Sequence, residues 1–139
     1  MSHKSLPQLL SWFEGLSPQN LSQISAFYQS NCYFKDPFNE FNGRDALEKV
    51  FAEMFQKLQQ PRFMIVESIS EANSAFIVWQ FHFFLRQRAF QINGSSHLKF
   101  DEQGLVFFHR DYWDAAEELY EKLPVIGFML RQLKKFNHS

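Results

Sequence analysis

Two groups that can exchange protons stand two residues apart in an aromatic stretch near the end of the chain. His109 and Asp111 lie within LVFFHRDYW, residues 105–113, where Arg110 is the only other charged residue. Residues two apart on a strand point to the same side. Burial among rings disfavours a charged carboxylate, and a protonated imidazole beside it favours that charge. The pattern therefore predicts a carboxyl group that takes up and returns a proton near neutral pH.

Strand alternation divides this stretch between two faces. If Asp111 points into the protein, the inward set is Phe107, His109, Asp111 and Trp113. The outward set is Phe108, Arg110 and Tyr112. We therefore expect Asp111 to be placed against aromatic side chains, with His109 beside it.

A second candidate carboxyl, Asp36, lies in YFKDPF, residues 33–38, which reads as a short strand stopped by Pro37. Proton transfer between carbons needs one mobile acid/base group beside the substrate. No His-x-x-x-His spacing occurs and no histidine is grouped with Cys32, so we expect no metal site. The alternative is that Asp36 is only a residue of the turn at Pro37 and has no catalytic role.

Composition favours a soluble, compact chain with a bulky interior. The chain has 139 residues and no linker-like stretch, so we expect one domain over residues 1–139. Its 18 phenylalanines can bury large areas and leave an internal hollow. The net charge of −1 argues against nucleic acid as a partner.

The cellular setting follows from what the sequence lacks. Cys32 is the only cysteine, so no internal disulfide is possible. The first residues lack the apolar run of a signal peptide, and no continuous run of 18 apolar residues occurs. We expect a reduced, cytoplasmic protein without a membrane span.

Hydrophobic periodicity predicts helices followed by a run of strands. Helical spacing occurs over residues 5–16, 17–29 and 43–60, with Ser17 as N-cap of the second helix and a strand over 32–38. Four strands are expected over 62–70, 74–87, 90–100 and 105–113, and helical pieces from Asp114 onward. This order predicts an α+β fold: a curved antiparallel sheet, wrapped by three to four helices, that encloses a cone-shaped space.

The element order resembles the nuclear transport factor 2-like superfamily, also called SnoaL-like or ketosteroid isomerase-like. Residues 43–55, GRDALEKVFAEMF, and 109–127, HRDYWDAAEELYEKLPVIG, resemble the corresponding segments of limonene epoxide hydrolases. Residues 33–38 resemble the strand of ketosteroid isomerases that carries their catalytic aspartate. Because this fold hosts enzymes, ligand binders and trafficking proteins, it leaves the function open.

The resemblance implies roles for individual residues. Asp36 takes the position of the isomerases' general base, and Trp12 and Ser96 take the positions of their oxyanion-binding groups. Asp111 takes the position of a hydrolase carboxylate, and of the aspartate that a histidine assists in SnoaL-like polyketide cyclases. Phe81 and Phe83 stand where the hydrolases have an Arg-x-Asp pair. The implied catalytic set is Asp36, His109 and Asp111, and the implied substrate-binding set is Trp12, Trp79, Phe81, Phe83, Ser96 and Trp113.

Three functions remain open from the sequence. The first is a cofactor-independent acid/base enzyme (of the isomerase, cyclase or hydratase/hydrolase type) acting on an apolar small molecule in the cone-shaped space. The second is a non-catalytic binder of a lipid-like or polycyclic ligand in the same cone. The third is an adaptor that binds other proteins through the outer face of its sheet. An enzyme requires Asp36 to converge with Asp111 or His109 on one open cavity.

The outer sheet face and the C-terminal segment suggest a partner subunit. The outer face is expected to carry Phe84, Phe108 and Tyr112 together with His82, His97 and Arg110. Exposed apolar patches of this kind mark interfaces, and the resemblance implies a homodimer through this face. The amphipathic stretch 127–136 is expected to close the mouth of the cone or pack on a partner subunit rather than bind a membrane.

Overall fold

The computed structural model describes residues 6–114 of the chain, which form helices and a six-stranded sheet. The elements in chain order are α1 (Leu6–Glu14), the 3-10 helix η2 (Leu21–Ala26), β1 (Tyr28–Lys35), β2 (Glu40–Asn42), α2 (Arg44–Lys57), β3 (Gln59–Glu71), β4 (Ser74–Leu85), β5 (Arg88–Phe100) and β6 (Val106–Tyr112). The predicted α+β class and the run of four strands after α2 are confirmed.

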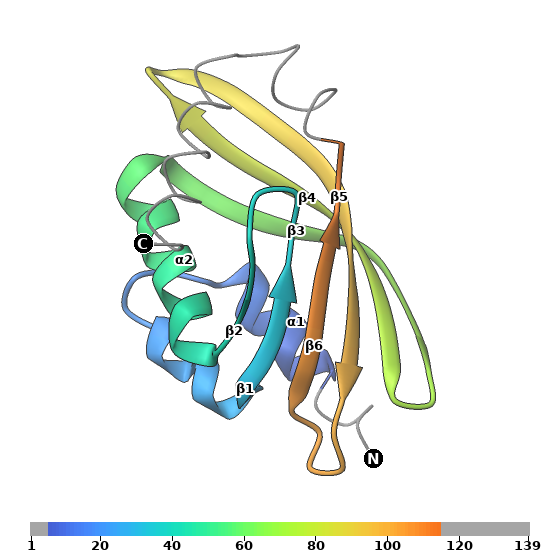
Figure 1. The fold of residues 1–139 in the computed structure, drawn as a ribbon. Coiled ribbons are helices and arrows are strands. Elements are labelled where there is room, and N and C mark those ends of the chain that lie inside the picture. The colour runs from blue at the N-terminus through green and yellow to red at the C-terminus, as the bar shows by residue number, and fades with distance from the viewer. Residues whose placement is uncertain (1–5, 115–139) are drawn as a thin grey trace.

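The strand order, β2-β1-β6-β5-β4-β3, puts β1 and β6 next to each other (Figure 1). Strands β3 to β6 form an antiparallel meander, whereas β1 pairs with β6 in parallel. In that parallel register Phe34 is opposite His109 and Lys35 is opposite Arg110. Asp36 and Asp111 come directly after the pair formed by Lys35 and Arg110. The parallel pairing therefore brings both aspartates to the same end of the sheet.

The sheet curves around α1, η2 and α2, and the core lies between them (Figure 1). Helix α1 turns Leu9 and Trp12 toward the sheet, and α2 buries Leu47 and Phe51. This is the apolar stripe at helical spacing that the sequence shows. Gly43 precedes α2 with φ of 122°, a backbone conformation that disfavours other residues.

The predicted helix over residues 17–29 is wrong, because Asn20 forms a turn there. The Ser17 N–H donates to Asn20 Oδ1 at 2.8 Å, and Asn20 Nδ2 donates to the Gly15 carbonyl at 2.9 Å. Ser17 is therefore held in a turn instead of capping a helix, and only the short η2 follows. Tyr28 then begins β1, four residues earlier than the sequence pattern indicates. The short strand β2 lies between the predicted strand over 32–38 and the predicted helix over 43–60, where the sequence analysis predicts no strand.

The expectation that Phe107 faces the interior is also wrong. Lys99 pairs with Phe108 but Phe100 pairs with Val106, so a bulge leaves Phe107 without an opposite residue. Its side chain is 39% exposed. Beyond the bulge the alternation holds, with His109 buried and Tyr112 exposed.

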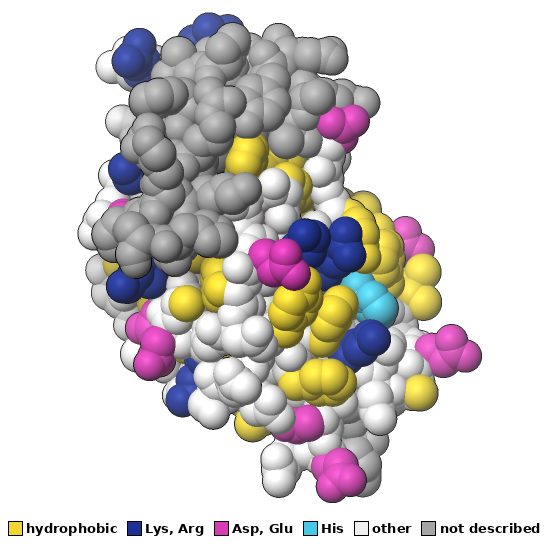
Figure 2. Space-filling model, viewed as in Figure 1, with side chains coloured by type: hydrophobic (Ala, Val, Ile, Leu, Met, Phe, Trp, Pro, Cys, Tyr) yellow, Lys and Arg dark blue, Asp and Glu magenta, His cyan; other side chains and the backbone are white. Residues whose placement is uncertain are grey.

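The outer sheet face carries aromatic and charged side chains together (Figure 2). Phe108 is half-buried there by Tyr33, whose ring stacks on it at 5.3 Å, and by Lys99, whose Nζ lies 4.8 Å from the ring centre. Phe84 and Tyr112 are exposed. A homodimer through this face stays a prediction, and the helices expected from Asp114 onward lie outside the described residues. Within residues 6–114, no helix is long and apolar enough to cross a bilayer.

The inner face of the sheet has one position where only glycine fits. Gly94 is opposite Trp79 in the β4–β5 register, and the indole lies against its backbone. A Cβ atom at Gly94 would come within 2.4 Å of Trp79 Cη2.

We predict that Gly94→Ala lowers the free energy of unfolding by about 1–3 kcal/mol, because the indole must move out of its packed position. Gly15→Ala is the matched control, since the nearest atom to its added Cβ is the Ser11 carbonyl oxygen at 3.4 Å. Urea denaturation measures both variants. Equal free energies of unfolding for Gly94→Ala and Gly15→Ala would show that the Trp79 indole does not pack against Gly94.

Candidate active site

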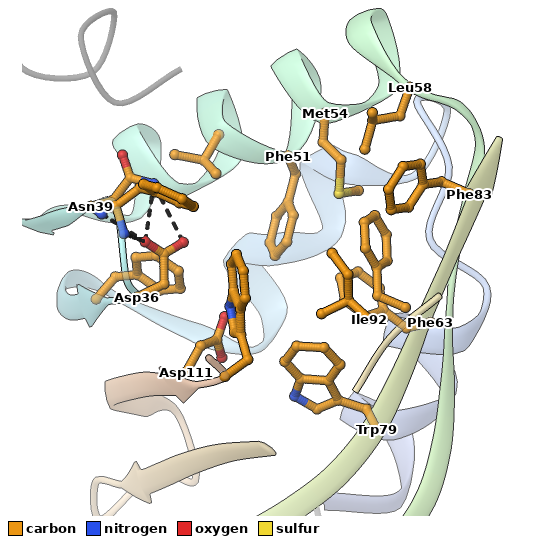
Figure 3. Close-up of a pocket in the computed structure, with 15 residues that line it drawn as sticks. Asp36, Asn39, Phe51, Met54, Leu58, Phe63, Trp79, Phe83, Ile92 and Asp111 are labelled. Atoms are coloured by element: carbon orange, nitrogen blue, oxygen red, sulfur yellow. Dashed lines mark hydrogen bonds between the residues drawn. The ribbon is translucent and has the colours of Figure 1, made fainter. Parts of the chain in front are cut away.

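An apolar cavity of about 110 Å³ lies between α2 and the inner faces of β1, β4, β5 and β6 (Figure 3). Its lining residues are Phe34, Asp36, Phe38, Asn39, Val50, Phe51, Met54, Leu58, Phe63, Trp79, Phe81, Phe83, Ile92, Asp111 and Trp113. Concave, mostly apolar spaces with a few polar groups are the usual form of small-molecule sites. The cavity is therefore the candidate site.

The polar groups of the cavity gather at one end. Asp36, Asn39 and Asp111 lie near the end of β1 and β6, and Leu58 and Phe83 lie at the opposite end (Figure 3). A ligand bound here would place its polar group near the carboxylates and its apolar body toward β4.

Asp36 is fixed by the turn that follows β1. Its Oδ1 accepts hydrogen bonds from the N–H groups of Phe38 at 2.8 Å and Asn39 at 2.6 Å, and Asn39 Nδ2 donates to both carboxylate oxygens at 3.2 and 3.3 Å. Burial and then the charge of Asp111 raise the pKa of Asp36 from 3.8 to about 6, against the lowering effect of these hydrogen bonds. Asp36 therefore changes protonation state close to neutral pH.

Asp111 is held on one oxygen by two short hydrogen bonds. Ser96 Oγ donates to Asp111 Oδ1 at 2.5 Å, and His109 Nε2 lies 2.6 Å from the same oxygen. Trp79 Nε1 in turn donates to Ser96 Oγ at 2.8 Å, which directs the serine hydroxyl hydrogen toward the carboxylate. Residues from β4, β5 and β6 thus fix the orientation of Asp111.

Tyr28 completes this hydrogen-bonded chain behind Asp111. Its hydroxyl is fully buried and lies 2.7 Å from His109 Nδ1. Since an ionised Asp111 can only accept, we assign the proton of neutral His109 to Nε2, and Tyr28 then donates to Nδ1. Burial, and less strongly the charge of Asp111, raise the pKa of Tyr28 well above its usual value, so it stays a donor.

A second, much smaller cavity of about 30 Å³ also borders Asp111. Its polar lining consists of Ser96, His109 and Asp111, and Phe13 of α1 and Ile65 of β3 form part of its wall. Trp79 and Asp111 border both spaces. Asp111 is therefore reachable from two sides.

The structure brings most of the sequence-predicted site residues together. Asp36, Asp111, Trp79, Phe81, Phe83 and Trp113 line the main cavity, and His109 and Ser96 line the smaller one. Trp12 lines neither space, because its Nε1 donates to the Asn20 carbonyl at 3.0 Å and its ring packs 5.3 Å from that of Phe27. Across residues 6–114 no three His, Cys, Asp or Glu side chains converge in a way that could hold a metal ion.

Sequence reasoning missed Tyr28 and Asn39. Tyr28 falls within the helix predicted over residues 17–29, although the buried positions of β1 are all even-numbered and lead back from Phe34 through Cys32 to Tyr28. Asp36 makes an Asx turn with the Phe38 N–H, and this turn brings the backbone and side-chain N–H groups of Asn39 to the same carboxylate. Recognising where β1 starts would have revealed Tyr28.

We predict that Asp36 titrates near pH 6 in carboxyl ¹³C NMR and that Asp111→Asn moves its pKa downward, because the substitution removes a neighbouring negative charge. Glu71→Gln, at the exposed end of β3, is the control and should leave the midpoint unchanged. A midpoint near 4 in the unaltered protein, or no movement in Asp111→Asn, would disprove the coupling of the two carboxylates.

Comparison with solved structures places the fold among known proteins. The chain is 11% identical to an LEH-like epoxide hydrolase from M. tuberculosis, covering 92% of this chain and 96% of that one, with a TM-score of 0.72. A ketosteroid isomerase-like protein from Catenulispora acidiphila DSM 44928, in complex with trimethylamine, is 12% identical over 84% and 92% of the two chains, with a TM-score of 0.71. TerC, co-crystallised with polyporic acid, is 12% identical over 86% and 96%, with a TM-score of 0.72.

At these identities the structural likeness establishes the fold, and the family is established by sequence. No curated protein matches the chain. The sequence pattern of the SnoaL-like domain matches residues 9–109, which is well over half of the chain and includes Asp36 and His109. The chain therefore belongs to the SnoaL-like domain family and has the nuclear transport factor 2-like cone fold.

Proposed function

We propose that this protein is a cofactor-independent acid/base enzyme that acts on a small apolar substrate, with Asp36 and Asp111 exchanging protons with it. The observation that carries the proposal is that both carboxyl groups border one cavity whose remaining wall is almost entirely apolar. Buried carboxyl groups are costly to maintain without a function, and titratable groups with altered pKa values in a cleft are typical of active sites.

Asp36 has the properties of a proton shuttle. With a pKa of about 6 it is mostly ionised at pH 7 and can take a proton from carbon or from water. Its conjugate acid is then strong enough to return that proton to another atom of the substrate. The hydrogen bonds from the turn hold Oδ1 and leave Oδ2 with only the 3.3 Å contact from Asn39.

Asp111 is the second acid/base group in this proposal, and His109 fixes it. Both described hydrogen bonds to Asp111 end on Oδ1, so within residues 6–114 none reaches Oδ2. His109 keeps the carboxylate oriented, and Tyr28 keeps His109 in the tautomer that donates to it. The substrate would then contact Asp111 through Oδ2.

A non-catalytic binder in the same cavity is the second candidate. Asp36 has a structural reason to be where it is, since it closes the turn at Pro37. Solved relatives of this fold hold small molecules, namely trimethylamine in one and polyporic acid in another. A binder would keep its affinity when the carboxylates are neutralised, whereas the enzyme would lose turnover.

The activity test begins with the protein from its own cells. Native mass spectrometry identifies a co-purified small molecule, and turnover is then followed on that compound, on a β,γ-unsaturated cyclic ketone and on a cyclic epoxide. We predict turnover that rises as pH increases through about 6, since Asp36 must be ionised. Asp36→Asn and Asp111→Asn should each reduce it at least about 100-fold.

Both variants keep a side-chain oxygen that can accept the native hydrogen bonds, so a loss of turnover is separated from a loss of structure. Glu71→Gln serves as the charge-matched control outside the cavity. Wild-type turnover in either aspartate variant would refute the catalytic assignment and leave the binder as the better account.

We also predict that Asp36→Asn makes the protein more stable above pH 6. The pKa of Asp36 is raised in the folded state, so its favourable contribution is complete below about pH 4 and is lost as pH rises through about 6. Neutral Asn avoids that loss, which gives about 3 kcal/mol of extra unfolding free energy at pH 8 and less than about 1 kcal/mol at pH 4. Urea denaturation at both pH values measures it, and a destabilised variant at pH 8 would show that Asp36 is mainly a structural turn residue.

A further inference from the structure

The polar end of the main cavity is rich in hydrogen-bond acceptors. Asn39 is only 6% exposed, and it turns Nδ2 toward Asp36 and Oδ1 away from it (Figure 3). Its Oδ1 has no hydrogen-bond partner among the described residues. Oδ2 of Asp111 has no hydrogen bond among the described residues and Oδ2 of Asp36 has only the 3.3 Å contact from Asn39, so two carboxylate oxygens at this end are free or nearly free to accept. A ligand that satisfies them must donate.

The charge of this end is negative inside the main cavity, and Lys35 and Arg110 border the two aspartates only from a separate open groove. Among the lining residues of the main cavity that the structure describes, none is Lys, Arg or His. The nearest imidazole, His109, is engaged by Asp111 and Tyr28. The pKa of Asp36 is raised first by burial and then by the charge of Asp111, which is the electrostatic sign of two anions in one apolar space.

Aromatic rings surround the carboxylates. Phe34, Phe38 and Trp113 line the cavity beside Asp36 and Asp111, and the rings of Phe38 and Trp113 lie 5.7 Å apart. The face of an aromatic ring attracts a cation, most strongly where water is excluded. Carboxylates and ring faces together form the environment that binds an organic ammonium ion.

We infer that the cavity selects a lipophilic ammonium ion, an apolar molecule that carries one protonated amine, over neutral and anionic molecules of the same shape. The ammonium group donates to the carboxylates and lies against the rings, and the apolar body extends toward Leu58 and Phe83. The inference rests on the proposed function only in using the same cavity, and it names the class of substrate that the cavity admits.

Three ligands of similar shape but different charge should differ in their affinity for this cavity. An alcohol donates one hydrogen bond but leaves the repulsion between Asp36 and Asp111 in place. A carboxylate adds a third negative charge beside the two aspartates. An ammonium ion compensates the charge of both aspartates, and hydrogen bonds with charged partners are stronger than neutral ones.

The test uses 3-phenylpropan-1-amine, 3-phenylpropan-1-ol and 3-phenylpropanoate, which differ only in the terminal group. Isothermal titration calorimetry at pH 8 should show the amine binding about tenfold or more tighter than the alcohol, and no binding of the anion. The preference for the amine should fall as pH decreases through about 6, where Asp36 takes up a proton. Bound amine should also lower the pKa of Asp36 in carboxyl ¹³C NMR, by linkage.

Asp36→Asn and Asp111→Asn should each lose the preference for the amine and keep the affinity for the alcohol, whereas Glu71→Gln should keep both. Alcohol binding equal to or tighter than amine binding at pH 8 would overturn the ammonium inference and leave the proposed enzyme intact. Binding of none of the three molecules would contradict the ammonium inference together with the cavity as a ligand site. Amine binding with unchanged turnover in the aspartate variants would support the ammonium inference and refute the enzyme.

Discussion

Two carboxyl groups share one apolar cavity, and the parallel pairing of β1 with β6 is what brings them there. The register that sets Phe34 against His109 carries both strands to the same end of the sheet, where Asp36 and Asp111 follow. Without water to screen them, the two negative charges oppose each other, and burial adds to the cost. The raised pKa of Asp36 reflects this cost. The protein retains both carboxyl groups at the cavity where a ligand fits.

The surrounding structure supports the two aspartates in different ways. Asp36 depends on a local turn, whose backbone N–H groups reach it within three residues. Asp111 depends on long-range contacts, since Ser96 comes from β5 and Tyr28 from the start of β1 by way of His109. Asp36 can therefore change protonation without disturbing the sheet, while Asp111 is locked to the core through a chain of hydrogen bonds.

The sequence predicts what depends on local periodicity. The stripe of α2, the meander of β3 to β6 and the placement of His109 and Asp111 on one face of their strand follow from spacing alone. The parallel β1–β6 pairing joins segments about 75 residues apart and has no local signal, so its consequences for Asp36 came only through the family resemblance. The bulge at Phe107 and the turn made by Asn20 depend on single contacts that periodicity does not encode. Tyr28 was missed because its strand begins inside an apparent helical pattern.

The central claim is that Asp36 and Asp111 act on one bound molecule inside the cavity. A crystal structure of the protein at pH 8 with 3-phenylpropan-1-amine tests it most directly. The account predicts the amine nitrogen within hydrogen-bond distance of both carboxylates, with the phenyl ring toward Phe83. An amine on the outer sheet face, or a cavity closed by its own phenylalanine side chains, would contradict it.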